Sequence, residues 1–207
     1  MTKRFLSDES KTALTNAVKA IEARTSAEIV IAVRARSGSY PLGPAVVGIA
    51  LGFAALAFVL YSRFTFPLWA ILIDPFVVGL ATGFAATRVP AIQRMLMLPS
   101  HCAARVRRGA QSTFFEKGVR HTRNRIGVLV YVSLLEQRLE LIGDAGVEEA
   151  VGPADWQHAG KALDAVVRRG GSGQDLAAAM EKLGDLLESC LERAHDDENE
   201  LPDEVCA

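Results

Sequence analysis

Two long apolar stretches interrupt a chain that elsewhere mixes polar and apolar positions. From Ser37 to Ser62 there are 26 consecutive uncharged residues, and residues 44–62 are almost wholly apolar. At 1.5 Å per residue, a helix of this length crosses a hydrocarbon core of about 30 Å. A second apolar run, residues 66–87, contains Asp74 as its only charge. The pattern predicts two membrane-spanning helices, at about 44–62 and 66–87.

A buried core helix is the alternative explanation for the second run. Such a helix needs protein around all its faces, and the remaining domain is too small to enclose two of them. A signal peptide is not favoured either, because the first run begins near residue 44, behind a segment with helical periodicity. We therefore expect both helices to stay in the mature protein.

Small residues recur within both predicted spans. Gly48 and Gly52 form one GxxxG pattern, and Gly79 and Gly83 form another. Missing side chains let helices approach closely, which favours packing of the two spans on each other. Glycine is also common in membrane helices generally, so both explanations stay open.

Asp74 is the one acidic residue in the apolar runs, and an intramembrane carboxylate suggests a functional site. However, it lies towards one end of its span and precedes Pro75, which removes a helical hydrogen bond. The sequence favours a kink or an interfacial polar residue over a transport or proton site.

Outside these runs, helical and strand periods alternate. Ser7 followed by two acidic residues is typical of a helix start, and Leu14, Val18 and Ile21 continue with helical spacing. A β-branched run with apolar residues at successive positions is typical of a strand buried on both faces. The predicted elements are helices at 7–24 and 99–120, strands at 28–34, 127–134 and 138–142, and two final helices separated by residues 170–173.

This order predicts an α/β fold with a small mixed sheet, interrupted by the hairpin. Residues 1–36 supply the first helix and strand, 37–88 the hairpin, and 89–194 the remainder of the domain. Residues 195–204 contain six acidic residues and no apolar period. We therefore expect 195–207 to be a disordered tail.

Charge is distributed unevenly. Residues 1–36 carry seven positive and four negative charges, residues 88–125 nine and one, and residues 126–207 six and eighteen. Arginines flank the outer ends of both spans, whereas the connecting turn has only Arg63. By the positive-inside rule, both soluble segments are predicted to be cytoplasmic.

The basic segment after the second span predicts a contact with the lipid bilayer and its anionic headgroups. Nucleic-acid binding is the alternative, with Phe114 and Phe115 as stacking groups. Periodicity instead places Phe114 in the core, so the sequence predicts no nucleic-acid partner.

One segment has a more specific pattern. It comprises a predicted strand, then Gly143, and then the Asp-x-Gly motif formed by Asp144 and Gly146. A predicted helix that contains Trp156 follows about a dozen residues later. This segment resembles the TPM-domain family, named after a thylakoid lumen protein, a photosystem II protein and a nematode acetylcholine-receptor modulator. The resemblance covers residues 1–36 and about 99–192 and implies an α/β/α sandwich. Its other residues are Phe114, Phe115, Glu116, Lys117, Gly118, Thr122, Arg123, Asn124, Arg125, 127–134, Glu136, Arg138 and Ile142.

The resemblance implies two kinds of activity. Some members look like acid phosphatases with divalent-cation sites, and others are auxiliary factors for assembly or repair of membrane complexes. Asp144 matches the family's Asp-x-Gly as a possible metal-site carboxylate. This chain differs from the extracytoplasmic members by its internal hairpin.

The residues themselves leave the metal site open. With Glu148 and Glu149 close behind, Asp144 could bind Ca²⁺ or Mg²⁺ through oxygen ligands at the carboxyl end of a strand. Arg123 or Arg125 could hold a phosphate. The alternative, which the sequence favours, is that Asp144 caps the next turn while both glutamates are solvated.

Other candidate motifs are weaker. The glycines at 170–173 have no preceding strand and no following Lys-Ser/Thr, so a helix end and a Ser172 cap are favoured over a phosphate loop. Ser133 has no GxSxG context. The histidines and the cysteines Cys102, Cys190 and Cys206 show no metal or nucleophile spacing, and free thiols fit a reducing compartment.

These features lead to one main hypothesis. The chain is predicted to be a two-span membrane protein with a TPM-like cytoplasmic domain that serves as a binding or auxiliary module for a membrane protein complex. The alternative is a divalent-cation-dependent phosphatase that uses Asp144.

Overall fold

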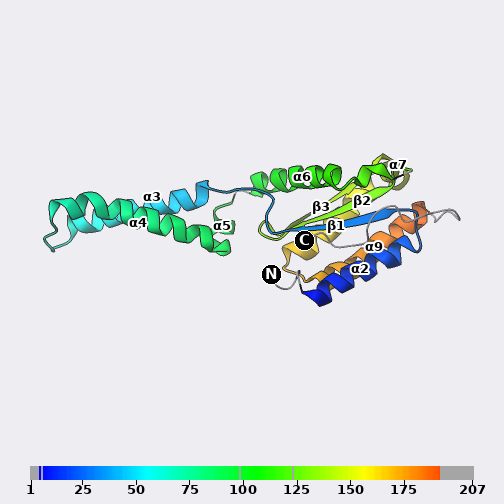
Figure 1. The fold of residues 1–207 in the computed structure, drawn as a ribbon, viewed down its shortest axis with the longest axis horizontal. Helices are drawn as coiled ribbons and strands as arrows, with labels where there is room; N and C mark the ends of the chain where they lie inside the picture. Colours follow the sequence, from blue (N-terminus) through cyan, green and yellow to red (C-terminus); the bar gives the residue numbers. More distant parts are fainter. Residues whose placement is uncertain (1–4, 6, 98, 123, 192–207) are drawn as a thin grey trace. The chain divides into compact units, whose positions relative to one another are not determined.

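The structure is a computed structural model, and it describes residues 5, 7–97, 99–122 and 124–191. The chain forms two compact units, Met1–Ser37 with Ala103–Ala207, and Gly38–Cys102. Figure 1 shows the elements of both. The predicted tail at 195–207 lies outside the described residues.

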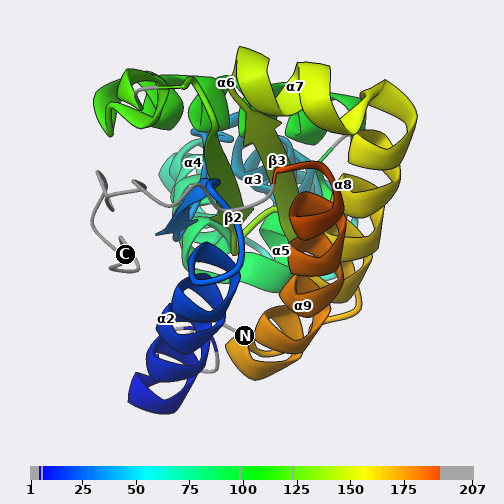
Figure 2. The same cartoon turned by 90° about the vertical axis from the view of Figure 1, so that its right-hand side faces the viewer.

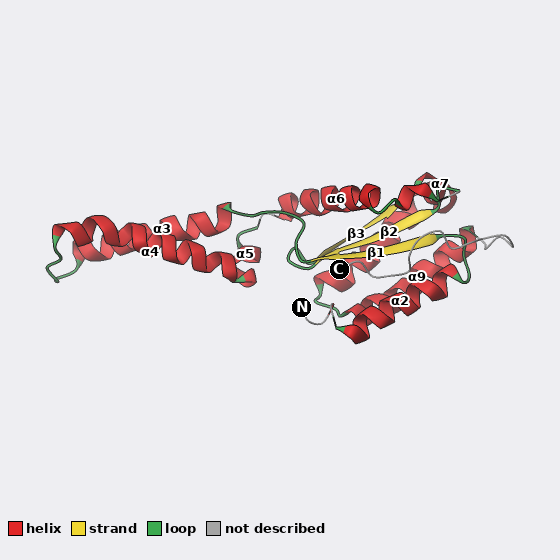
Figure 3. Cartoon of the chain, in the orientation of Figure 1, coloured by secondary structure: helices red, strands yellow, loops and turns green. Residues whose placement is uncertain are grey.

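A small mixed sheet forms the centre of the first unit (Figure 3). Strand β1 (Glu28–Arg34) pairs in parallel with β2 (Gly127–Ser133), and β3 (Arg138–Gly143) pairs with β2 in antiparallel fashion, which gives the order β1-β2-β3. The predicted α/β class and small mixed sheet are confirmed, and each strand ends within one residue of its predicted end.

Three helices cover one face of the sheet. They are α2 (Asp8–Glu22), α8 (Pro153–Arg168) and α9 (Gly173–Cys190), and α2 and α9 lie side by side in Figures 1 and 2. Alternate strand residues point towards them because side chains along a strand alternate between faces. This core includes Ile29, Ile31, Val33, Val128, Val130 and Val132 from the strands and Leu14, Leu163, Leu176 and Met180 from the helices.

Helix α6 (Pro99–Glu116) covers the opposite face. Val106, Ala110 and Phe114 pack there against Val30, Ala32, Leu129 and Tyr131. Strand β1 is therefore buried on both faces, as predicted, and Phe114 is a core residue. The predicted helix at 99–120 is shorter, because Gly118 adopts a φ of +67° and a 3-10 turn, η1 (Val119–His121), follows it. A short helix, α7 (Ala145–Val151), was not predicted.

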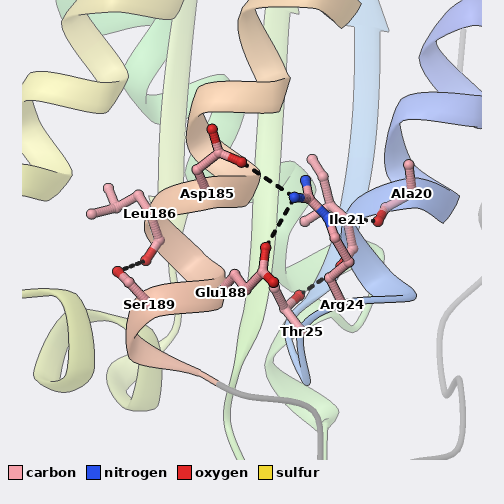
Figure 4. Close-up of polar contacts among 8 residues, drawn as sticks. All are labelled: Ala20, Ile21, Arg24, Thr25, Asp185, Leu186, Glu188 and Ser189. Atoms are coloured by element: carbon pink, nitrogen blue, oxygen red, sulfur yellow. Dashed lines mark hydrogen bonds and ion pairs between the residues drawn. The ribbon is translucent and has the colours of Figure 1, made fainter.

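Helices α2 and α9 are joined by apolar contacts and by charged contacts, and Figure 4 shows the charged ones. The Arg24 guanidinium lies 3.2 Å from a carboxylate oxygen of Asp185 and 2.9 Å from one of Glu188. Beside it, a Cβ atom on Gly184 would lie 2.8 Å from Cγ1 of Ile21. The small residue on α9 thus lets the end of α2 approach closely.

The second unit consists of α3 (Leu42–Tyr61), α4 (Leu68–Arg88) and the short α5 (Pro90–Met95). The two long helices match the predicted spans within about two residues at each end. The unit extends to Cys102, beyond the predicted boundary at residue 88. The reason is that the chain packs back on the hairpin after α5, where Leu96 contacts Gly43.

Candidate functional site

The two glycine patterns of the second unit face each other across the α3–α4 seam. A Cβ atom on Gly48 would lie 2.5 Å from the carbonyl oxygen of Gly79, and one on Gly52 would lie 2.8 Å from that of Pro75. Only glycine, which has no side chain, fits at these positions without movement of the neighbouring helix. The backbones of the two helices are therefore in direct contact. Of the two explanations left open by the sequence, the structure shows packing of the two helices on each other.

The outer surfaces of this hairpin are apolar and exposed. Only 22% of the most apolar window of α3 and 6% of that of α4 is buried by the described chain, whereas a core helix of a soluble protein is mostly buried. Exposed side chains include Phe53, Phe58, Phe76 and Phe84. Both helices are long and apolar enough to cross a membrane. Soluble proteins rarely expose apolar surface of this extent.

Asp74 lies in the second turn of α4 and is half-buried. The helix continues through Pro75, whose carbonyl oxygen faces Gly52 in the seam. This position, towards the turn between the two helices, agrees with the preference for a polar residue near one end of the span.

The residues of the Asp-x-Gly pattern converge at the start of α7. One Asp144 carboxylate oxygen accepts hydrogen bonds from the Ala145 amide at 2.7 Å and from the Arg125 guanidinium at 2.9 Å. A Cβ atom on Gly146 would lie 2.7 Å from the carbonyl oxygen of Asn124. Arg125 has a φ of +57°, which residues other than glycine rarely adopt. The pattern therefore holds the loop before β2 against the helix after β3.

The predicted metal site at Asp144, Glu148 and Glu149 stays a prediction. Strand β3 is antiparallel to β2, so Asp144 lies beside the amino-terminal end of the parallel pair, away from the carboxyl edge where open α/β sheets bind ligands. Glu148 and Glu149 are exposed, and within the described chain no three His, Cys, Asp or Glu residues form a group that could hold a metal ion. The favoured alternative, with Asp144 as a cap and both glutamates solvated, describes what is seen.

The second Asp144 oxygen is buried and has no hydrogen-bond partner among the described residues. Arg123, one of the two arginines considered for phosphate, lies outside them.

A polar cluster that the sequence did not indicate lies at the carboxyl edge of the parallel strands. Ser37 follows β1, Tyr131 and Ser133 belong to β2, and Glu136 lies in the turn before β3. The Ser37 amide donates to Glu136 at 2.9 Å, and the Ser37 hydroxyl lies 3.0 Å from that of Tyr131. Ser133 is fully buried and donates to Glu136. We call these four residues the Ser37 cluster.

The Ser37 cluster has a defined position in the chain. Ser37 is the last residue of the first unit before Gly38 begins the second. A Cβ atom on Gly109 of α6 would lie 2.7 Å from the Tyr131 hydroxyl, so α6 also closes over the cluster. No local motif could have identified it, because Ser37 meets the other three residues only through the pairing of β1 with β2.

Glu140 of β3 is half-buried beside Arg107 and Arg138. Burial raises the pKa of this carboxyl above its ordinary value of 4.5, and the charge of Asp164 acts in the same direction. Arg107 and Arg138 partly oppose this pKa rise. The sequence pattern did not indicate this raised pKa, because Glu140 occupies an ordinary alternating position on an edge strand.

The glycine-rich segment at 170–173 separates two helices. Gly170 has a φ of +82° after α8, and Ser172 caps α9 in a capping box with Asp175. This confirms the helix-end and cap interpretation over the phosphate loop.

Comparison with protein-family models finds no match, and comparison with curated proteins finds none either. Among solved structures, the NMR structure of the BA42 protein from the psychrophilic bacterium Bizionia argentinensis is similar to this chain. The TM-score is 0.60 and the sequence identity 18%, over 100% of this chain and 97% of that protein. At this identity the similarity shows the fold alone.

Proposed function

We propose that this protein is an integral membrane protein with two spans, whose soluble domain is a TPM-like α/β/α sandwich. The observation that carries the proposal is the exposed apolar surface around a tightly packed helical hairpin. Burial of this surface in lipid removes apolar area from water, and the intrahelical hydrogen bonds satisfy the backbone. If alkaline carbonate extraction released the full-length protein from membranes, the proposal would fail.

We further propose that both soluble segments face the cytoplasm. Arg34, Arg36, Arg88 and Arg94 flank the hairpin, and Arg63 is the one basic residue in its turn. Membrane-impermeant maleimide on intact cells should label a Thr65→Cys variant from which Cys190 and Cys206 have been removed. It should label Cys190 of the native chain only after lysis. The opposite pattern would reverse the orientation.

The soluble domain is proposed to act as a binding or auxiliary module for a membrane protein complex. The sequence resemblance to the TPM-domain family supports this role, since some members of that family are auxiliary factors of membrane complexes. Cross-linking in intact membranes, followed by purification in mild detergent, should recover a defined membrane protein with the full-length chain. Recovery of the chain alone at native expression levels would contradict the proposal.

A divalent-cation-dependent phosphatase is the second candidate. It is favoured by one observation, the buried and unpartnered carboxylate oxygen of Asp144 beside the Arg125 guanidinium. A phosphatase requires hydrolysis of a phosphate ester with Ca²⁺, Mg²⁺ or Mn²⁺ that Asp144→Ala abolishes and that Glu181→Ala, at an exposed position of α9, preserves. Equal rates in both variants would eliminate this candidate.

A further inference from the structure

We propose that the outer face of α6 docks on an anionic bilayer surface, as a membrane contact additional to the hairpin. The α6 outer face is defined by His101, Arg108 and Phe115, with Arg120 just beyond the helix. The inference rests on the proposed function in one respect, namely that the hairpin holds the chain at a bilayer.

The helical period separates this face from the buried one. His101, Arg108 and Phe115 are seven residues apart, which is close to two turns, so they form one line along α6. Val106 and Ala110, each fully buried against the sheet, lie on the opposite side. The three outer residues are all exposed.

Phe115 is the unusual member of this face. Its side chain is 60% exposed, although its neighbour Phe114 is buried and packs edge-on against it with ring centroids 6.0 Å apart. The Arg120 guanidinium lies over the Phe115 ring, 5.4 Å from its centroid. An exposed aromatic ring with a cation over its face is suited to the headgroup region, where the ring enters the acyl boundary and the cation meets phosphate.

The charged residues that flank Phe115 along the sequence are almost all basic. Residues 88–125 contain nine basic residues and one acidic residue, Glu116. Glu116 accepts a hydrogen bond from the Ser112 hydroxyl at 2.8 Å. Within the part of the chain that the structure describes, no ion pair joins Arg108 or Lys117 to a carboxylate. This surface is thus complementary to an anionic one.

The covalent connection favours lipid over other anionic partners. Ten residues, 89–98, separate the end of α4 from α6, and even fully extended they reach no more than about 36 Å. A hairpin in the bilayer therefore keeps the α6 outer face at a high effective concentration near the headgroups. A nucleic acid or an acidic protein has no such covalent connection. The chain's own acidic residues 195–204 do have one, so the experiment must distinguish them from lipid as the occupant of this face.

The test uses the full-length chain with tryptophan in place of Phe115. In a Trp69→Phe background, Phe115→Trp is reconstituted into vesicles of phosphatidylcholine, alone or mixed with phosphatidylglycerol. A brominated phosphatidylcholine serves as the quencher. The buried core residue Trp156 is present in every sample. Glu181→Trp, exposed on α9 across the sheet from α6, is the matched control position.

We expect the fluorescence of the tryptophan introduced on α6 to shift to the blue and to be quenched only in vesicles that contain phosphatidylglycerol. The double variant Arg108→Glu with Arg120→Glu should weaken docking about 10-fold or more, since each basic residue contributes about 1 kcal/mol near an anionic surface. The matched reversal of Lys161 and Lys182, on α8 and α9, should leave docking unchanged. High salt should also abolish it, because the screening length falls to about 3 Å at 1 M.

Other outcomes overturn the inference in distinguishable ways. Quenching of Trp69 in the parent chain, without quenching in the Phe115→Trp variant, would leave the membrane hairpin intact and refute α6 docking. The absence of quenching in both proteins would refute the proposed function as well. A blue shift in neutral detergent that disappears when residues 195–207 are removed would show that the acidic tail covers this face, and docking on lipid would be rejected.

Discussion

The hydroxyl oxygen of Ser37 lies 2.7 Å from that of Ser133, and Ser37 is the donor. Since the single hydroxyl hydrogen of Ser37 is used there, the contact between Ser37 and Tyr131 must have the tyrosine as donor. The hydroxyls of Tyr131, Ser37 and Ser133 thus form a directed chain that ends on the Glu136 carboxylate. The hydrogen bonds in such a chain polarise one another. This chain of bonds holds Ser37, the last residue before the hairpin unit, in place.

Replacement of Ser133 should therefore loosen the exit of the chain from the domain. Ser133→Ala removes a fully buried hydroxyl and leaves the Ser37 hydroxyl and Glu136 without that partner, which should cost about 1–3 kcal/mol of stability. Hydrogen exchange by mass spectrometry should show faster exchange in residues 35–40. The control Ser112→Ala removes an exposed hydroxyl on α6 and should leave this exchange unchanged. Equal exchange in both variants would contradict a role for the Ser37 cluster.

The glycine seam predicts a position-specific loss of hairpin stability. Gly79→Ile places a branched side chain at a position where a Cβ atom alone would lie 3.0 Å from the Gly48 carbonyl oxygen, so the helices must separate. We expect destabilisation of about 1–3 kcal/mol, as for other overpacked contacts. An SDS titration followed by circular dichroism measures it. Ala50→Ile, on an exposed position of α3, should be nearly neutral, and a similar loss in both variants would refute the seam.

Glu140 predicts a pH dependence of defined sign. Because its pKa is raised in the folded state, its contribution to stability is fully present below 4.5 and is lost as pH rises through the folded pKa. Glu140→Gln should consequently raise Tm at neutral pH, by no more than about 3 °C, and the difference from the parent should vanish below pH 4.5. Thermal unfolding in detergent at several pH values measures this.

Arg107 provides the matched test of that explanation. Arg107→Gln removes a charge that lowers the Glu140 pKa, so the pH window should move upwards and the protein should be less stable at neutral pH. A parent protein with no stability change across the window would show that Glu140 is not perturbed.

Asp144 is expected to affect stability more than surface acids do. Asp144→Ala removes the cap of α7 and the bond to Arg125, which should cost about 0.5–2 kcal/mol. Glu149→Ala, on the same helix but exposed, should stay within about 0.5 kcal/mol of the parent. Denaturant unfolding in detergent compares them. A greater loss of stability from Glu149→Ala than from Asp144→Ala would contradict the capping role.

Much of the fold follows from local periods in the sequence. The strand at 28–34 was predicted at its observed bounds because β-branched residues at successive positions are typical of burial on both faces. The two apolar helices were also predicted, since length and lack of charge are properties of the sequence itself. The short helices α5 and α7 were missed, because six or seven residues are too few to establish a period.

The sequence by itself determined the apolar hairpin, the basic segment beside it and the order of helices and strands, because each of these depends on neighbouring residues. Only the tertiary structure decided that Asp144 lies at the amino-terminal edge of the parallel pair and that Ser37 meets Ser133 at the opposite edge. The position of Asp144 depends on the antiparallel direction of β3 against β2. The contact between Ser37 and Ser133 depends on the parallel pairing of β1 with β2, segments about a hundred residues apart. No local pattern encodes such pairing, since its free energy comes from contacts that exist only after the chain has closed on itself.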